Sequence, residues 1–177
     1  MRVVSGIFRH RHFEVPRTFK ARPTTDFAKE NLFNVLANRI DLEGATALDL
    51  FSGTGSISLE LLSRGCSRVI SVEKDRDHYA FIRKVMETVG TRNSLIINGD
   101  VFKYLERCQE QFDFIFADPP YQLPELGDIP DIVLSRNLLK PDGIFVLEHG
   151  EQYNFKDNPH FRQMRVYGSV HFSFFEI

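Results

Sequence analysis

Short apolar runs alternate with amphipathic stretches along the chain from residue 45 onward. Five of the runs have the length and composition of buried strands, namely residues 45–51, 68–73, 94–98, 112–117 and 144–149. Between them, apolar residues recur at helical spacing, which predicts helices over 56–65, 75–90, 101–108 and around Ile129 to Leu139. Apolar strands separated by helices are typical of a parallel sheet that is covered on both faces.

The two ends of the chain depart from this alternation. Residues 161–168 and 169–177 are strand-like with almost nothing between them, so we expect an antiparallel hairpin at the sheet edge that turns at Gly168 and Ser169. At the other end, residues 2–6 and 12–16 predict a small basic hairpin. A helix from about Phe27 to Asn38 follows, which Thr24, Thr25 or Asp26 could cap. The predicted fold is therefore α/β, with a seven-stranded, mostly parallel sheet.

Length and composition agree with one globular domain. The chain has 177 residues, of which 42% are hydrophobic, and we expect a basic N-terminal arm over 1–25 and a catalytic core over 26–177. The first residues contain no apolar signal core, and no apolar run reaches the roughly 18 to 20 residues that a membrane span needs. Cys66 and Cys108 have no metal or redox spacing, so a reduced cytoplasm is expected. A monomer is the default expectation.

Charge is distributed unevenly along the chain. Residues 1–22 hold six of the 22 basic side chains and one of the 24 acidic ones, a formal charge of +5, which leaves −7 for the remainder. This pattern is typical of a basic arm that meets phosphates. A solvated hairpin with charged flanks is the alternative that charge alone leaves open.

A glycine-bearing loop connects the first strand to its helix, in the stretch LDLFSGTGSISLE (48–60). Gly53 and Gly55 allow the backbone to turn sharply and to approach a ligand closely. The position that a dinucleotide fingerprint gives to a third small glycine or alanine is Ser58, and no lysine follows as in a Walker loop. The loop therefore favours a nucleoside ligand without a pyrophosphate.

Acidic residues stand at the ends of the next two strands. Glu73 could accept hydrogen bonds from both hydroxyl groups of a ribose, and Asp100 could meet an adenine amino group at the edge where open parallel sheets bind ligands. Each also has a simpler interpretation, since Asp100 could cap the next helix and Glu73 could be a solvated acid. Together with the loop, the two acids favour an adenosine ligand.

The fourth strand ends in FADPPY (116–121). Because Pro120 restricts Pro119 to an extended conformation, the Pro119 carbonyl and the Asp118 carboxylate can be held as two hydrogen-bond acceptors at a fixed separation. Such a pair suits the two hydrogens of an exocyclic amino group on an unpaired or flipped base, and Tyr121 offers a face on which that base can stack. The alternative is a proline-rich turn after a strand-terminating acid.

These motifs resemble, in order and position, those of the S-adenosylmethionine-dependent amino-methyltransferases of the Rossmann-like class. The stretches MRVVSG (1–6) and RPTTDFAKENLFNVL (22–36) are similar to the RsmD family, which methylates the N2 amino group of a guanine in 16S ribosomal RNA. The resemblance runs nearly the whole chain. It implies a Rossmann-like fold, S-adenosyl-L-methionine as cofactor, and 16S rRNA or a small ribosomal subunit particle as partner.

The resemblance also implies roles for particular residues. Asp49, Gly53 and Gly55 would lie at the methionine end of the cofactor, Glu73 at the ribose and Asp100 at the adenine. Phe51 would be a further cofactor-binding residue. Asp118, Pro119 and Tyr121 would serve the target base. The arm is His-rich (RHRHF), unlike the family pattern, so its contacts are not carried over. Candidate RNA contacts are Arg9, Arg11, Arg22 and Thr24.

The expected reaction is direct transfer of the sulfonium methyl to guanine N2, with positioning and desolvation as the main contributions of the enzyme. No metal is required, and the histidines show no ligand spacing. Three alternatives stay open. An adenine N6-methyltransferase would use the same pair of acceptors, a protein glutamine methyltransferase would carry Asn where Asp118 stands, and an assembly factor could bind RNA without catalysis.

Overall fold

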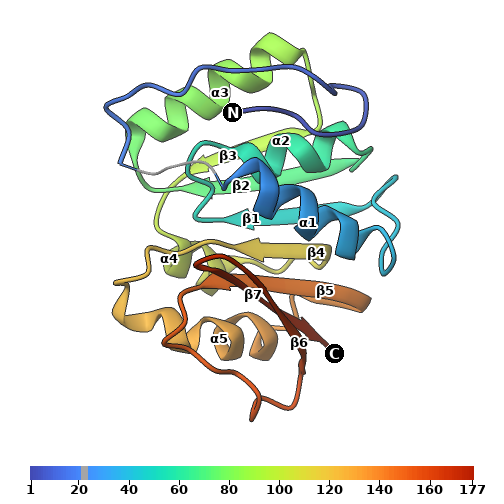
Figure 1. Cartoon of the computed structure of the whole chain (residues 1–177), viewed down its shortest axis with the longest axis vertical. Helices are drawn as coiled ribbons and strands as arrows, with labels where there is room; N and C mark the ends of the chain where they lie inside the picture. Colours follow the sequence, from blue (N-terminus) through green and yellow to red (C-terminus); the bar gives the residue numbers. More distant parts are fainter. Residues whose placement is uncertain (21–23) are drawn as a thin grey trace.

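A single sheet of seven strands organises the molecule (Figure 1). The structure is a computed structural model and describes residues 1–20 and 24–177. The strand order is β3-β2-β1-β4-β5-β7-β6. The strands are β1 (Thr46–Leu50), β2 (Arg68–Glu73), β3 (Ser94–Asn98), β4 (Phe112–Ala117), β5 (Leu139–His149), β6 (Phe161–Tyr167) and β7 (Val170–Glu176).

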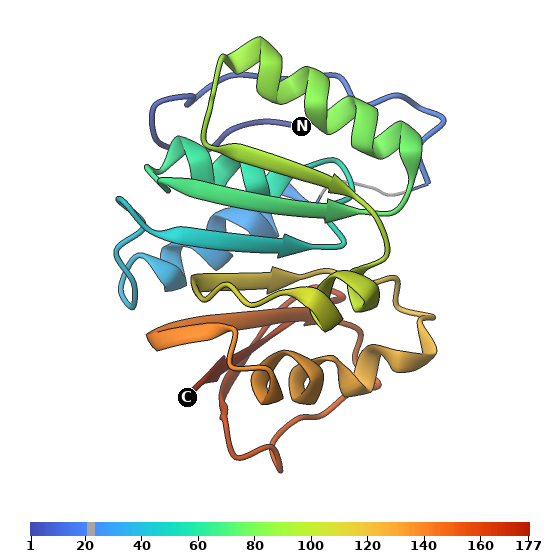
Figure 2. The same cartoon turned by 180° about the vertical axis from the view of Figure 1, so that it is seen from behind.

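Helices cover both faces of the sheet, as predicted (Figures 1 and 2). One hydrophobic core lies between the sheet and α1 (Asp26–Leu36), α2 (Ser56–Ser63) and α3 (Arg76–Val89). A second core lies on the opposite face, under α4 (Val101–Arg107), the short 3-10 helix η1 (Pro124–Asp128) and α5 (Ile129–Ser135). Thr25 caps α1, since its hydroxyl oxygen accepts a hydrogen bond from the N–H of Ala28 at 3.2 Å.

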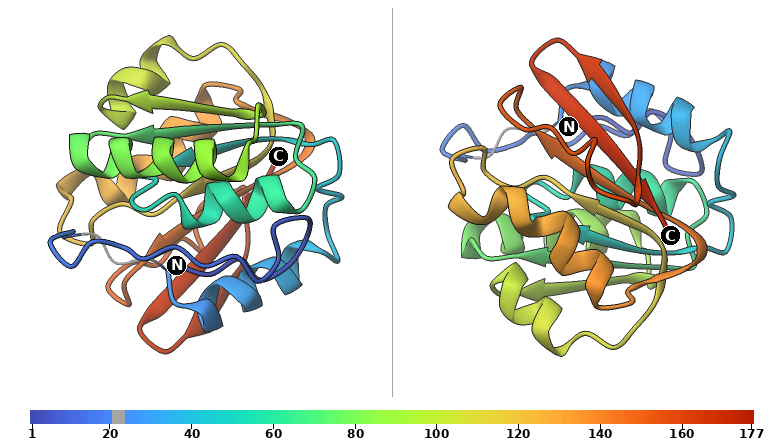
Figure 3. Two further views of the ribbon diagram at one scale, coloured as in Figure 1. Left: turned by 90° about the horizontal axis from the view of Figure 1, so that it is seen from above. Right: turned by 90° about the horizontal axis from the view of Figure 1, so that it is seen from below.

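Most of the predicted strands are confirmed. β2, β3 and β4 have the predicted bounds, and the pairs from β3 to β5 are all parallel. The predicted C-terminal hairpin is also confirmed, with Gly168 in the left-handed conformation (φ 62°) at its turn. β7 pairs antiparallel with β5, so β6 lies at the outer edge of the sheet (Figure 3).

The connection between α5 and β5 differs from the prediction. The helix expected to reach Leu139 ends at Ser135, and β5 begins at Leu139 rather than at residue 144. Asn137 adopts a positive φ of 56°, which stops the helix, and Asp142 has a φ of 64° within the first part of the strand. Asparagine and aspartate tolerate this conformation better than most residues, and the register between β4 and β5 shifts over the same part of the strand.

The N-terminal arm is less regular than the predicted hairpin. Its two halves join through one antiparallel bridge, between Arg2 and His12. The N–H groups of Val4 and Ser5 donate to the carboxylate of Glu60 on α2 instead of to a partner strand. The arm therefore lies along α2 and α3 as a docked segment, as Figure 3 shows from above.

Strand order reverses between β1 and β4, because the chain proceeds from β1 to β2 and β3 on one side and then crosses to β4 on the other. In open α/β sheets, ligands bind at this switch point, beyond the carboxyl ends of the strands. The loops after β1 and β4, which carry the glycines and the DPPY stretch, therefore meet at the same edge.

Candidate active site

A cavity of about 750 Å³ opens at this edge of the sheet, within the size range of small-molecule sites. It is bounded by the loops that follow β1, β2, β3 and β4, by Glu148 near the end of β5, and by the end of the N-terminal arm. The structure brings together most of the predicted site residues on its walls: Phe51, Gly53, Glu73, Asp100, Asp118, Pro119 and Tyr121.

Asp49 is fully buried beneath the glycine loop. Its carboxylate accepts hydrogen bonds from the backbone N–H of Ser58, at 3.1 Å, and from the Ser58 hydroxyl. Burial raises the pKa of Asp49 to about 7, although the donations from Ser58 oppose the shift. Asp49 thus ties the end of β1 to the first turn of α2, and it lines a small adjoining cavity of about 60 Å³ together with Thr24 and Asp118.

The loop itself has a backbone that few sequences could adopt. Phe51, Gly53 and Gly55 all have positive φ, at 59°, 55° and 75°. Phe51 is the costly member, because a residue with a side chain is strained in this region, and such strain is concentrated at functional sites. Gly53 lines the cavity. Gly55 precedes α2, where a Cβ would lie 3.0 Å from Ile82, so its lack of a side chain serves helix packing rather than the cavity wall.

Glu73 is held in place by two backbone donors. Its Oε2 accepts the N–H of Gly53 at 2.7 Å, and its Oε1 accepts the N–H of Asp75 at 2.8 Å. The side chain is largely buried but forms part of the cavity wall. Since an ionised carboxylate has about four lone-pair sites, acceptor capacity remains on both oxygens.

Asp100 caps α4, as the alternative interpretation proposed. Its Oδ1 accepts the N–H groups of Phe102 and Lys103 at 3.0 and 3.2 Å, and Lys74 lies 3.4 Å from Oδ2. Burial opposes ionisation of Asp100, but the donations from Lys103 and Lys74 outweigh it and lower the pKa. Asp100 also lines the cavity, where Phe102 packs edge-on against Phe51. Its contact with an adenine stays a prediction.

Asp118 directly follows β4, and its N–H donates to the carbonyl of Leu50 at 3.2 Å. Its side chain lines both the large and the small cavity. Burial, followed by the nearby charges of Glu148 and Asp49, raises its pKa well above the ordinary value. Within residues 1–20 and 24–177, no hydrogen bond or ion pair engages its carboxylate.

Glu148 is a site residue that the sequence analysis missed. It stands near the end of β5, is only 6% exposed, and lines the cavity beside Asp118. Its Oε1 accepts the Tyr121 hydroxyl hydrogen at 3.1 Å. Burial raises its pKa to about 7, and the hydrogen bond from Tyr121 opposes the shift. An acid at the end of an otherwise apolar strand, in IFVLEH, was the signal that could have identified it.

The arm reaches the cavity at its C-terminal end only. Lys20 lines the cavity mouth, and the Phe19 ring packs against His78, with 4.4 Å between ring centroids. Neither Lys20 nor Phe19 was predicted as part of the site.

Arg9 and Arg11, two of the predicted RNA contacts, lie away from the cavity, whereas Thr24 lines the small cavity beside it. Arg9 and Arg11 are exposed in the turn of the arm, which packs on the C-terminal end of α2, and an Nη2 of Arg11 lies 3.5 Å from the Thr88 carbonyl near the end of α3. Both helices begin at the site, so these arginines lie at the opposite end of the molecule. Arg22 lies outside the described residues. RNA contact by any of these residues stays a prediction.

No cluster of histidine, cysteine and acidic side chains suited to a metal ion occurs in the part of the chain that the structure describes. Among the same residues, no helix is both long and apolar enough to cross a bilayer.

Comparison with known proteins identifies the family and supports the fold. The chain is 31% identical over 152 residues to the ribosomal RNA small subunit methyltransferase D of Haemophilus influenzae, covering 84% of this chain and 78% of the relative. Identity to the protein of the same name from Escherichia coli K12 is 30% over 148 residues, covering 84% and 74%. A hypothetical protein of Thermus thermophilus superposes with a TM-score of 0.87, 26% identity and coverage of 100% and 99%.

A more distant structure extends the likeness of the fold. The Thermus thermophilus 16S rRNA N2 G1207 methyltransferase, RsmC, solved in complex with AdoMet and guanosine, has a TM-score of 0.70 at 22% identity and covers 89% of this chain and 45% of that one. The architecture is that of the Rossmann-like methyltransferases. A family model described as conserved hypothetical protein 95 matches residues 1–176, and the chain therefore belongs to this family, that of the RsmD-type rRNA methyltransferases.

Proposed function

We propose that the protein uses S-adenosyl-L-methionine to methylate the exocyclic N2 of a guanine in 16S rRNA, of the guanine-966 type. One observation carries the proposal. The Asp118 carboxylate, which has no partner among the described residues, opens into the same cavity as Gly53 and Glu73. An acceptor for an amino group and the walls of a nucleoside site thus share one space.

The cavity walls suit this cofactor. Gly53 offers a backbone without a side chain, and Glu73 keeps acceptor capacity on both oxygens for ribose hydroxyl groups. Phe51 and Phe102 provide an apolar wall for an adenine ring. The bound cofactor supplies an electrophilic methyl group on a sulfonium. The names of the relatives, and the AdoMet complex of RsmC, support the same assignment.

The side chains after β4 would hold and orient the target base. Asp118 and the Pro119 carbonyl accept the two amino hydrogens, which directs the nitrogen lone pair toward the methyl group. Tyr121 stacks on the ring, a contact worth roughly 1–3 kcal/mol. As the N–C bond forms and the S–C bond breaks, the nitrogen becomes positively charged. Asp118 stabilises that charge, and its raised pKa allows it to accept the released proton.

Nucleoside mass spectrometry of ribosomal RNA tests the proposal. A strain without this protein should lose one N2-methylguanosine from 16S rRNA. The wild-type gene should restore it and the Asp118→Ala variant should not. Loss of N6-methyladenosine instead would show that the adenine alternative is correct. Unchanged rRNA methylation in a strain with a ribosome assembly defect would favour the non-catalytic alternative.

A transfer assay with tritiated cofactor then separates the possible substrates. Undermethylated small-subunit particles and protein-free 16S rRNA should be compared in the same experiment, since either could present the base. Labelling of one and not the other defines the substrate. No labelling of either, by an enzyme that binds the cofactor, would contradict the proposal.

A further inference from the structure

Two acids stand side by side at the carboxyl ends of neighbouring parallel strands. Ala117 of β4 pairs with Leu147 of β5 in the last register position of this pair, so Asp118 and Glu148 are the next residue on each strand. Adjacent strands lie about 4.8 Å apart. Phe116 and Val146, two residues earlier, belong to the same core under α1 and α2, so alternation places the two carboxyl groups on the same face of the sheet. Both line the large cavity.

Glu148 has more acceptor capacity than its protein partners use. Tyr121 donates to Oε1, whereas Oε2 is buried and has no hydrogen-bond partner among the described residues. Leaving a buried polar atom unpaired is costly, and such atoms in folded proteins call for an explanation. The last torsion of a glutamate side chain is soft, so either oxygen can turn toward the cavity. A ligand that donates a hydrogen at this wall would remove the deficit.

The strand ends beside Asp118 supply mainly hydrogen-bond acceptors, although the donor-bearing side chains of Gln122 and Lys20 also line the cavity. Asp118, the Pro119 carbonyl and Glu148 all accept, and the one hydroxyl among them, on Tyr121, already donates to Glu148. The two purines differ at this edge. Guanine presents the N1–H beside its N2 amino group, hence adjacent donors, whereas adenine presents an unprotonated N1 beside its amino group. An adenine would therefore direct a lone pair toward a carboxylate.

We propose that Glu148 determines base specificity by accepting the N1–H of the target guanine while Asp118 and Pro119 hold its N2 amino group. The inference rests on the proposed function and deepens it, because it supplies a physical reason for guanine over adenine. This specificity role differs from a purely structural one, in which Glu148 would only orient the Tyr121 ring through the hydrogen bond.

Substitution of one base in the RNA separates these roles. 2-Aminopurine keeps the exocyclic 2-amino group but has a lone pair at N1 in place of the N1–H. Once mass spectrometry has located the methylated nucleotide, RNA should be prepared with guanine or 2-aminopurine at that position. The wild-type enzyme should prefer guanine by on the order of 100-fold in kcat/KM, since the analogue lacks the donor and opposes the carboxylate. Glu148→Gln, whose amide can donate to N1, should reduce this preference to within about tenfold.

Tyr121→Phe is the matched control. It removes the donor to Glu148 and keeps the ring, so it should slow methylation of both RNAs alike and leave the preference for guanine unchanged. If Glu148→Gln transfers methyl to neither RNA, the affinities of the two RNAs with S-adenosylhomocysteine bound should show the same change in preference.

An unchanged preference in Glu148→Gln, with guanine still methylated by the wild type, would overturn the specificity role and leave the proposed function intact. Methylation of adenine by the wild type would overturn both.

Discussion

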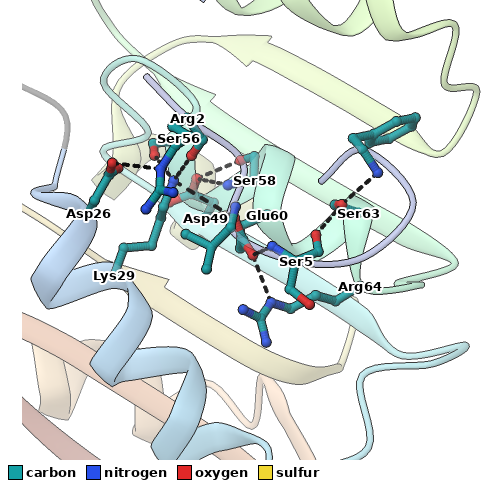
Figure 4. A network of polar contacts seen from close by, with 12 residues as sticks. Arg2, Ser5, Asp26, Lys29, Asp49, Ser56, Ser58, Glu60, Ser63 and Arg64 are labelled. Atoms are coloured by element: carbon teal, nitrogen blue, oxygen red, sulfur yellow. Dashed lines mark hydrogen bonds and ion pairs between the residues drawn. The ribbon is translucent and has the colours of Figure 1, made fainter. Parts of the chain in front are cut away.

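Two groups of carboxylates lie on the same side of the sheet and differ in how far partners compensate them; Glu60, Asp49 and Glu148 are buried, and Asp118 is half-buried. Glu60, which is fully buried on α2, is saturated with partners (Figure 4). Its oxygens accept the N–H groups of Val4 and Ser5 at 2.8 and 3.0 Å and the Arg64 Nε–H at 2.9 Å. The buried Lys29 ammonium lies 3.8 Å away and also donates to Ser56 and to the Arg2 carbonyl.

The group at the cavity has no such compensation. Asp49, Asp118 and Glu148 have no basic side chain within ion-pair distance among the described residues, and the pKa of each is raised, chiefly by burial. A buried acid with every oxygen paired, such as Glu60, therefore fastens one part of the chain to another. A buried acid without a cationic partner is a cost that the fold carries, and that cost is expected where a ligand supplies the missing donors.

The largest expected effect is on catalysis. Asp118→Ala removes the acceptor at the target nitrogen, so methyl transfer should fall by at least about 10³-fold, the scale of losing one preorganised electrostatic group. The affinity for S-adenosylhomocysteine, measured by calorimetry, should stay within a few-fold, because Asp118 lies on the part of the wall assigned to the base. An equal loss of both would contradict the separation of base and cofactor sites.

The stability of the fold should be most sensitive to substitutions in the group around Glu60. Glu60→Ala leaves the Lys29 ammonium buried without its acid and two N–H groups of the arm unpaired, so the free energy of unfolding should fall by about 3–5 kcal/mol. Denaturation by urea measures it. Glu87→Ala is the matched control, since Glu87 forms an exposed pair with Arg83 at the same helical spacing. It should change stability by no more than about 0.5 kcal/mol, and equal effects would contradict the comparison.

The dependence of stability on pH should reveal the uncompensated acids. The folded-state pKa values of Asp49 and Glu148 are about 7, above the ordinary values near 4, so the folded state binds more protons than the unfolded state between these limits. Their contribution to stability is therefore lost as pH rises from about 4 to about 7. The other titratable groups that influence these two acids are Glu73, whose charge raises the pKa of Asp49, Asp118, which interacts with both acids, and Tyr121, which donates a hydrogen bond to Glu148.

The measurement is a series of thermal unfolding curves across this pH range. Glu148→Gln should flatten the decline by about 1–2 kcal/mol, because the amide does not titrate. Methyl transfer by the wild type should show the opposite trend and rise with pH through about 7, since the base requires ionised acceptors. A decline that is as steep in the variant would contradict the assignment.

The smallest effect is expected on RNA binding, from a substitution in the N-terminal arm. Arg11 is exposed and far from the cavity, so Arg11→Ala should weaken RNA binding only a few-fold and reduce the slope of log K against log salt by about one. Arg165→Ala, on the exposed edge strand β6, removes the same charge from the other end of the sheet and is the control. If both variants bind RNA alike, the arm has no special part in recognition.

The sequence predicted the strands that carry this site, but not every side chain that lines it. Strands 68–73 and 112–117 were predicted correctly because short, mainly apolar runs of this length usually form buried strands. Asp118 could be located because the two prolines after it mark the end of the strand. Glu148 was missed because a single acid at the end of an apolar strand resembles a solvated terminus. Whether it is buried depends on the distant β7, with which β5 pairs.

The Glu60 group was missed for a related reason. Glu60 is covered by segments distant in the sequence, namely the N-terminal arm, which supplies the N–H groups of Val4 and Ser5, and α1, which supplies Lys29. The docking of the arm determines that Arg9 and Arg11 lie away from the cavity and that Lys20 reaches it. The course of the N-terminal arm is fixed by hydrogen bonds to residues distant in the sequence, so the pattern of neighbouring residues does not predict it.

The most direct test compares two isosteric changes, Asp118→Asn and Glu60→Gln, by urea unfolding of the cofactor-free protein at alkaline pH, which favours the ionised form of an acid whose pKa is raised, as that of Asp118 is. Asp118→Asn should have a higher free energy of unfolding than the wild type, by about 0.5–2 kcal/mol, and should transfer no methyl group. Glu60→Gln should be less stable than the wild type. A destabilised Asp118→Asn, or one that still methylates RNA at the wild-type rate, would contradict the claim that this half-buried acid is left unpaired for the sake of the substrate.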